Sequence, residues 1–181
     1  MIEAFEPLPR VMAIQPSTRG FGWAVFEGPH SNRGLGVSYA HGPHNERNVL
    51  CVTNADALLA HHSPQTLVLE AYEPPHQNHG RRIDLGRALT ALALHRGVEV
   101  VTYTKQEVLK AFAAWGARTR YEIAEVVSRV LVPGSKIPQK RKHWNGETFR
   151  MAAFAAAALV ATHYHKGNDQ IHEDVRRSTY G

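Results

Sequence analysis

Basic side chains gather in three stretches of the chain, and such clusters favour a polyanionic ligand. One stretch begins with Arg81 and Arg82. The other two contain Lys105, Lys110, Arg118 and Arg120, and then Lys136, Lys140, Arg141 and Lys142 beside Trp144. Lysine and arginine neutralise phosphates, and an aromatic ring stacks on an unpaired base. We therefore predict a nucleic-acid surface, with a solvated face as the alternative for each stretch taken alone.

One acidic side chain, Glu70, is placed to do chemistry on such a ligand. The run TLVLEAY, residues 66–72, is nearly continuous in apolar residues, which predicts a strand buried on both faces and ending at Glu70. The carboxylate could ligate a metal ion. Alternatively, it could accept hydrogen bonds from Thr18 or Arg19 of a facing turn.

Composition predicts one basic domain in a reducing compartment. The chain has 181 residues, 43% of them hydrophobic, and its formal net charge is +5. That length fits a single core. The single cysteine, Cys51, rules out an internal disulfide, and the longest apolar run is too short to span a bilayer. We expect a cytoplasmic protein with one domain over residues 1–166 and a polar, loosely held tail over residues 167–181.

The elements that position these side chains follow from hydrophobic periodicity and turn residues. Residues 11–26 form two strands joined by a tight turn, and GLGVSYAHG adds a third. Two further buried strands are predicted over residues 66–72 and 98–104. Helices are predicted over residues 46–63, 81–97, 105–116, 121–132 and 147–165, the last with Asn145 as its cap. Together these elements predict a mixed five-stranded α/β sheet with helices on both faces.

Four segments, in this order, carry a family resemblance. AIQPSTRGFGWAV resembles an I-D-P-G-x-x-x-x-G strand and turn, and PQTLVLEAYE is similar to a strand ending in a catalytic Glu. The segment from IDLGRALT to RTRYEI resembles an L-G-x-x-R-G helix, a strand and a basic helix-turn. AAFAAAALVATHYH is similar to a D-A-A-D-A-x-x-x-A-x-x-H helix. The chain thus resembles the RuvC family of Holliday-junction resolvases over residues 11–165.

The resemblance implies an RNase H-like fold and a homodimer that grips four-way DNA junctions. It also implies strand cleavage with two divalent ions, Mg²⁺ or Mn²⁺, held by four ligating side chains. By position, these four are Gln15, Glu70, Ala152 and Ala155. Only Glu70 is acidic, so it is the one metal ligand that the sequence retains.

The absence of three ligands greatly weakens metal binding. A divalent ion and a carboxylate about 4 Å apart attract by about 8 kcal/mol at an effective dielectric of about 20, before desolvation is subtracted. Gln15 keeps a neutral carbonyl acceptor, whereas Ala152 and Ala155 offer no ligand. We therefore predict an impaired or lost catalytic centre.

Three nearby residues are candidate substitutes for the missing ligands. Glu147 precedes Ala152 by five residues, although a carboxylate in the first turn of a helix also serves to complement the helix dipole. Glu73 lies in the loop after Glu70, and His143 lies in the basic loop before the last helix. With any of them, a weakly active site could be rebuilt.

Eleven residues are predicted to contact DNA, and for four of them, Lys105, Lys110, Arg118 and Arg120, the resemblance implies phosphate contacts. For Tyr72, a wedge at the junction centre and plain packing are both open. The full set is Arg19, Tyr72, Arg81, Arg82, Lys105, Lys110, Arg118, Arg120, Lys140, Arg141 and Lys142.

A helix with small residues lies where the family dimerises. It contains Gly86, Ala88, Ala91 and Ala93, which would permit close approach of a second helix. The alternative is a monomer that uses this face against its own sheet.

Three functions follow from these observations. The preferred one is a junction-binding protein whose nuclease chemistry is lost. The second is an active, divalent-metal-dependent endonuclease that uses Glu70 with Glu147, Glu73 or His143. The third is a structural RNA-binding subunit of a larger assembly.

Overall fold

The chain folds around one five-stranded sheet. The computed structural model describes residues 8–72, 80–140, 142 and 148–179, with side chains up to residue 167. The strand order is β3-β2-β1-β4-β5. The strands are β1 (Arg10–Ser17), β2 (Gly20–Glu27), β3 (Asn32–Tyr39), β4 (Thr66–Glu70) and β5 (Glu99–Tyr103).

The first three strands form the predicted meander. β1 pairs antiparallel with β2, and β2 pairs antiparallel with β3, so the tight turn after Ser17 joins neighbouring strands. β4 then runs parallel to β1 on the other side. Because β1 and β4 are parallel neighbours, their carboxyl ends lie side by side at one edge of the sheet.

β4 is buried as predicted, but the prediction of a buried β5 is wrong. Four of the five β4 residues are buried, since β4 lies between β1 and β5. β5 is the last strand of the sheet, and its residues Glu99 and Thr102 are exposed. The apolar run of β5 resembles that of a central strand, but its place in the strand order decides its exposure.

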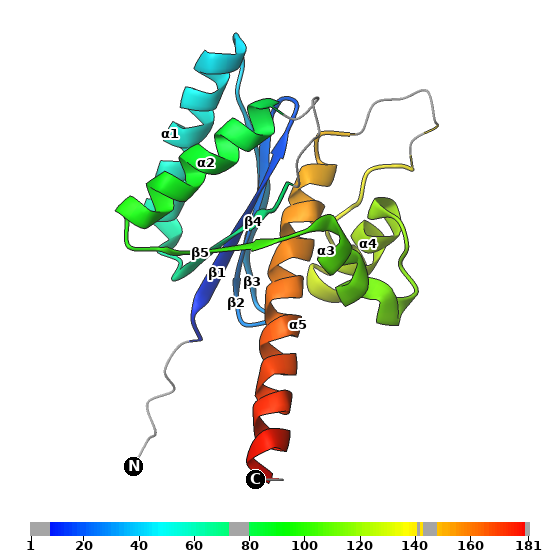
Figure 1. Cartoon of the computed structure of the whole chain (residues 1–181). Helices are drawn as coiled ribbons and strands as arrows, with labels where there is room; N and C mark the ends of the chain where they lie inside the picture. Colours follow the sequence, from blue (N-terminus) through cyan, green and yellow to red (C-terminus); the bar gives the residue numbers. More distant parts are fainter. Residues whose placement is uncertain (1–7, 73–79, 141, 143–147, 180–181) are drawn as a thin grey trace, which may run out of the picture.

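Helices cover both faces of the sheet, as Figure 1 shows. α1 (His44–His62) and α2 (Gly80–His95) lie on one face. α5 (Met151–Thr179) covers the other face, and α3 (Lys105–Phe112) and α4 (Arg120–Val126) pack on α5. A 3-10 turn, Ala113–Trp115, follows α3, and a π-helical segment, Val127–Leu131, follows α4. This arrangement confirms the predicted α/β architecture.

The last helix differs from its prediction at both ends. It begins at Met151, four residues after the predicted start at residue 147. It also continues to Thr179, through the segment that we predicted as a loosely held polar tail, so the backbone of most of that segment is helical. The division of the chain at residue 166 stays a prediction.

Alternation along the strands divides the core into two layers. Met12 and Ile14 of β1 pack in the layer under α1 and α2, whereas Val11 and Ala13 pack in the layer under α5. Because side chains alternate between faces, the next odd-numbered residue of β1, Gln15, points toward α5. The same alternation in β4 places Glu70 on the face of Val68, which is also the α5 face.

α2 turns part of its predicted dimer face toward its own sheet. Ala93 is fully buried in the layer under α1 and α2. A Cβ placed on Gly86 would have no atom within 4 Å, and Ala91 is exposed. Ala93 therefore belongs to the core, while Gly86 and Ala91 remain available on the outer surface.

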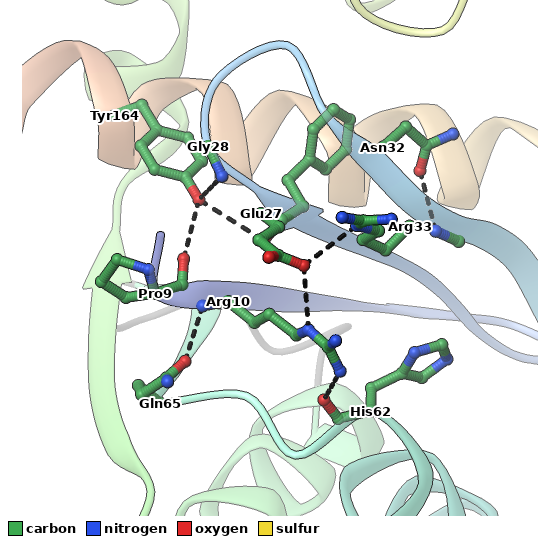
Figure 2. A network of polar contacts seen from close by, with 11 residues as sticks. Pro9, Arg10, Glu27, Gly28, Asn32, Arg33, His62, Gln65 and Tyr164 are labelled. Atoms are coloured by element: carbon green, nitrogen blue, oxygen red, sulfur yellow. Dashed lines mark hydrogen bonds and ion pairs between the residues drawn. The ribbon is translucent and has the colours of Figure 1, made fainter. Parts of the chain in front are cut away.

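A polar network closes the end of the sheet where β1 begins. The Glu27 carboxylate accepts from the guanidinium of Arg10 at 3.2 Å and from that of Arg33 at 3.0 Å. Arg10 also donates to the His62 carbonyl at 2.9 Å, and its backbone N–H donates to Gln65 Oε1. Figure 2 shows how these contacts join β1, β2, β3 and the loop before β4.

Tyr164 of α5 joins the same network. Its hydroxyl accepts from the Gly28 N–H at 2.9 Å and lies 3.4 Å from the carbonyl oxygens of Pro9 and Phe26 (Figure 2). This end of α5 is thus fixed to the sheet by polar contacts.

No helix in the described part of the chain has the length and hydropathy needed to cross a membrane.

β2 and α5 approach each other closely at Gly22. A Cβ placed on Gly22 would lie 2.1 Å from the carbonyl carbon of Ala152 and 2.3 Å from its oxygen. Both contacted atoms belong to the helix backbone, so no side-chain rotation relieves them. Glycine at this position therefore sets the distance between sheet and helix.

We expect Gly22→Ala to lower the free energy of unfolding by about 2 to 4 kcal/mol, because α5 must move away from β2. Urea unfolding measures the change. Gly167→Ala, in α5 and with open space around its Cβ, is the control and should be neutral or stabilising by up to about 1 kcal/mol. Equal stabilities of the two variants would contradict the close contact.

Candidate functional site

The carboxyl ends of β1 and β4 bring Gln15 and Glu70 together. Ile14 pairs with Leu69 in the parallel ladder, so the residues that follow lie side by side. Gln15 Nε2 donates a hydrogen bond to a Glu70 carboxylate oxygen at 2.5 Å. Gln15 and Glu70, to which the resemblance assigns the first two of the four ligating positions, therefore lie in contact, as predicted.

The hydrogen-bond partner of Glu70 differs from the one considered in the sequence. Donation from Thr18 or Arg19 was one of two alternatives for the carboxylate, beside a role as metal ligand. Within the described residues, the donor that contacts it from β1 is the amide of Gln15, which is only 4% exposed. A buried amide that donates to a carboxylate stabilises the charge without supplying a second one.

Tyr72 completes this polar group. Gln15 Nε2 lies 3.4 Å from the Tyr72 hydroxyl. Burial and the neighbouring Glu70 charge, with which the hydroxyl also forms a hydrogen bond, raise the pKa of Tyr72 well above its usual range. The phenol therefore stays protonated at neutral pH and can donate. Tyr72 thus has a polar role at this site, and its role as a wedge in DNA stays a prediction.

The two alanines of α5 lie beside this group in different ways. Ala152 is buried against the backbone of Gly22, the residue that pairs with Gln15 across β1 and β2. Ala155, one helical turn further, lines a cavity together with Gln15 and Glu70. Both positions therefore lie near the strand ends, as the resemblance implies.

The cavity has a volume of about 470 Å³ and lies between the strand ends and α3, α4 and α5. Its polar residues come from the β4 end, from Arg82 of α2 and from the starts of α3 and α4. Much of the remaining wall is apolar. The main apolar side chains are Val108, Leu109, Ile123, Met151, Phe154 and Leu159, with Ala155 and Ala158 between them.

The sequence analysis missed this apolar wall. The run MAAFAAAAL in α5 indicates a buried helix, and Met151 and Phe154 do contribute to the core. Val108 and Leu109 lie more than 40 residues earlier in α3. Only the packing of α3 on α5 shows that the same side chains also enclose a space next to Glu70.

Three predicted cations line the same cavity. They are Arg82, Lys105 and Arg120, and they come from three different helices. They surround the space that contains the single carboxylate of Glu70. The structure therefore brings together one residue of the first basic cluster and two of the second.

Capping boxes fix the backbone of two of these cations. The Thr104 hydroxyl accepts from the Glu107 N–H, and the Glu107 carboxylate accepts from the Thr104 N–H. α3 therefore begins at Lys105. Thr119 and Glu122 form the same box at the start of α4, which begins at Arg120. Each cation is thus the first residue of a capped helix, and its position depends on a threonine that precedes it.

The other predicted DNA-contacting residues lie around this group or elsewhere. Arg81 donates to the Ser17 carbonyl and to Asn48 Oδ1, which gives it a structural role between α2, α1 and the first turn. The Lys140 ammonium lies 5.8 Å from the centre of the Tyr121 ring. Lys140 is exposed, as are Arg19, Lys110, Arg118 and Lys142, and Arg141 lies outside the described residues.

Among the described residues, the metal-ligating atoms at the four positions do not fit a pair of divalent ions. Of the four positions, Ala152 and Ala155 have no ligand atom, and the Gln15 amide nitrogen faces Glu70. Two-metal sites need several oxygen ligands with negative charge. In the part of the chain that the structure describes, no three His, Cys, Asp or Glu side chains form a group that could hold a metal ion. The predicted substitutes Glu73, His143 and Glu147 lie outside that part.

We expect Gln15→Glu to destabilise the protein most at high pH. Two carboxylates then face each other, so one of them holds its proton to a higher pH than in the unfolded chain. The folded state binds more protons, and stability falls as pH rises. Urea unfolding should show a loss of roughly 1 to 3 kcal/mol at pH 8 and a smaller loss at pH 5.

The exposed loop residue Gln139 supplies the control, because Gln139→Glu introduces the same charge away from Glu70. Its effect on stability should be small at both pH values. A loss for Gln15→Glu that is the same at pH 8 and pH 5 would show that charge repulsion with Glu70 is not its cause.

Comparison with known proteins gives a consistent structural answer. No family model and no curated protein sequence matches the chain. RuvC of Thermus thermophilus superposes with a TM-score of 0.66 at 19% identity, covering 89% of this chain and 96% of RuvC. A structure of T. thermophilus RuvC in complex with Holliday junction substrate gives 0.67 at 20% identity, covering 88% and 95%.

A yeast protein has the same architecture at lower identity. The yeast mitochondrial Holliday junction resolvase Ydc2 superposes with a TM-score of 0.63 at 12% identity, and the match covers 94% of this chain and 83% of Ydc2. These likenesses extend over most of each chain. The chain therefore has the RNase H-like α/β fold that RuvC displays.

Proposed function

We propose that the protein binds branched, four-way DNA and that its catalytic centre no longer supports metal-dependent cleavage. The observation that supports binding most directly is the convergence of Arg82, Lys105 and Arg120 on one cavity. These residues lie in a fold shared with RuvC, one structure of which is a complex with Holliday junction substrate.

Electrostatics favours a DNA ligand at this edge of the sheet. The three cations outnumber the single carboxylate, Glu70, among the residues lining the cavity. Each phosphate neutralised by a lysine or arginine releases counterions, which makes binding favourable and dependent on salt. Lys110, Arg118 and Lys142, which follow Lys105 in the sequence, are exposed and add further positive charge to the surface.

The donor set supports the loss of cleavage. Glu70 is hydrogen-bonded to Gln15, and the α5 positions beside it are alanines. The alternative is an active endonuclease that uses Mg²⁺ or Mn²⁺ with Glu70 and one of the predicted substitutes Glu147, Glu73 and His143. A role as an RNA-binding structural subunit is the third candidate.

A homodimer is part of the proposal. Gly86 and Ala91 face outward on α2, and Leu94 of the same helix is 62% exposed. On the neighbouring α1, Val49 is 65% exposed and Leu50 is 44% exposed. An outer surface with small residues and exposed apolar side chains suits a second copy of the helix pair.

The cytoplasmic location of the protein also remains a prediction.

A labelled four-way junction tests the proposal against both alternatives. We expect the protein to bind it about tenfold or more tightly than a linear duplex of the same sequence, without nicking it in Mg²⁺ or Mn²⁺. Symmetric nicks that disappear in Glu70→Gln would establish the endonuclease instead. Tighter binding to duplex RNA than to the junction would favour the RNA-binding subunit.

The variants Lys105→Ala and Arg120→Ala test the binding surface. Each should weaken junction binding by about tenfold and lower the slope of log affinity against log salt by about one, because one phosphate contact is lost. Fluorescence anisotropy across a salt series measures both. Arg33→Ala is the control, since Arg33 pairs with Glu27 at the opposite end of the sheet. An unchanged slope in both cavity variants would contradict the assignment.

A further inference from the structure

We propose that the cavity beside Glu70 is a nucleobase pocket that holds an unpaired base, preferably guanine, with its phosphate among the three cations. This inference rests on the proposed function and goes further, because it names the group that enters the site.

The apolar wall suits the faces of a base. Val108 and Leu109 of α3 stand opposite Met151 and Phe154 of α5 around a space of about 470 Å³. That volume lies in the usual range of small-ligand pockets. A base presents two flat, apolar faces, and stacking on aromatic and apolar side chains favours its removal from water.

The alanines keep this space open and apolar. Ala155 and Ala158 lie one turn apart on the cavity side of α5, and each contributes only a methyl group. Carboxylates at such a wall would repel the π faces of a base and would need cations of their own. Ala155, which offers no metal ligand, therefore contributes to a surface on which a base can rest.

The polar end of the cavity suits the edge of a base that carries N–H groups. Glu70 has two carboxylate oxygens, and Gln15 donates to one of them. A carboxylate accepts hydrogen bonds, so it attracts amino and ring N–H groups and repels carbonyl oxygens. Guanine offers two adjacent donors, N1–H and the exocyclic amine, whereas thymine offers one N–H between two carbonyls. Guanine is therefore the preferred base.

The charges of the cavity indicate a nucleotide rather than an uncharged aromatic molecule. Arg82, Lys105 and Arg120 line the space that the apolar wall encloses. The phosphate of a nucleotide is attracted by this positive charge, whereas an uncharged ligand gains nothing from it. Base, sugar and phosphate together would contact the wall, Glu70 and the cations.

The first experiment asks whether the protein alone recognises the base. Isothermal titration calorimetry with dGMP, dTMP and 2-deoxyribose 5-phosphate measures three affinities. Their differences separate the contributions of the base, of its hydrogen-bonding edge and of the phosphate. We expect dGMP to bind about tenfold more tightly than dTMP, and the sugar phosphate to bind most weakly. Glu70→Gln should reduce the preference for dGMP over dTMP to about twofold or less. Equal binding of all three would overturn the pocket.

The second experiment asks whether the base comes from a DNA strand. Four-way junctions carry at the branch point an unpaired guanine or, in a matched molecule, an abasic site. The guanine junction should bind about tenfold more tightly than the abasic one. Ala155→Phe should abolish this difference because the new ring occupies the part of the cavity beside Gln15 and Glu70. His30→Phe, at an exposed position of the turn between β2 and β3, should preserve it.

The outcomes separate this inference from the proposed function. A junction that binds no better than linear duplex, with dGMP still bound selectively, would reject junction recognition and identify a free nucleotide as the ligand. Selective junction binding without a guanine effect and without dGMP binding would reject the pocket alone. If Ala155→Phe does not fold, the dGMP titration and Glu70→Gln still decide.

Discussion

The hydrogen bond from Gln15 to Glu70 is the interaction on which the site depends. Parallel pairing of β1 and β4 forces these two side chains together at 2.5 Å, on the face that α5 covers. Two carboxylates at this distance would need a shared proton or a cation between them, whereas an amide beside a carboxylate is stable without either. The neighbouring phenol of Tyr72 adds another donor. The strand ends thus form a hydrogen-bonded polar group that holds the Glu70 charge without a second carboxylate.

The character of the cavity follows from that arrangement. Gln15 donates to Glu70, and beside them Ala155 and Ala158 of α5 join an apolar wall with Phe154. The cations Lys105 and Arg120 keep their places through the capping threonines of α3 and α4. A positively charged rim and an apolar interior therefore coexist within one space.

The sequence was most informative where local pattern decides the structure. The meander and the strand ending at Glu70 follow from alternation and turn residues, and the structure confirms them. The break before the helix predicted from residue 121 is also present, although α4 begins one residue earlier, at Arg120. Burial of β5 and the inward position of Ala93 depend on which elements lie next to them, so local pattern could not decide either. The apolar wall joins α3 to α5, and the Gln15 hydrogen bond joins β1 to β4; no local pattern encodes such long-range contacts.

The network around Glu27 and Tyr164 has a consequence for how this protein can change over time. It fastens β1, β2, β3 and α5 at the end of the sheet farthest from Glu70. Anchorage of the scaffold is thereby uncoupled from the chemistry at the other end. Mutations could alter the lining of the cavity one side chain after another while the architecture persisted, so a lineage could exchange one ligand for another without first having to evolve a new fold.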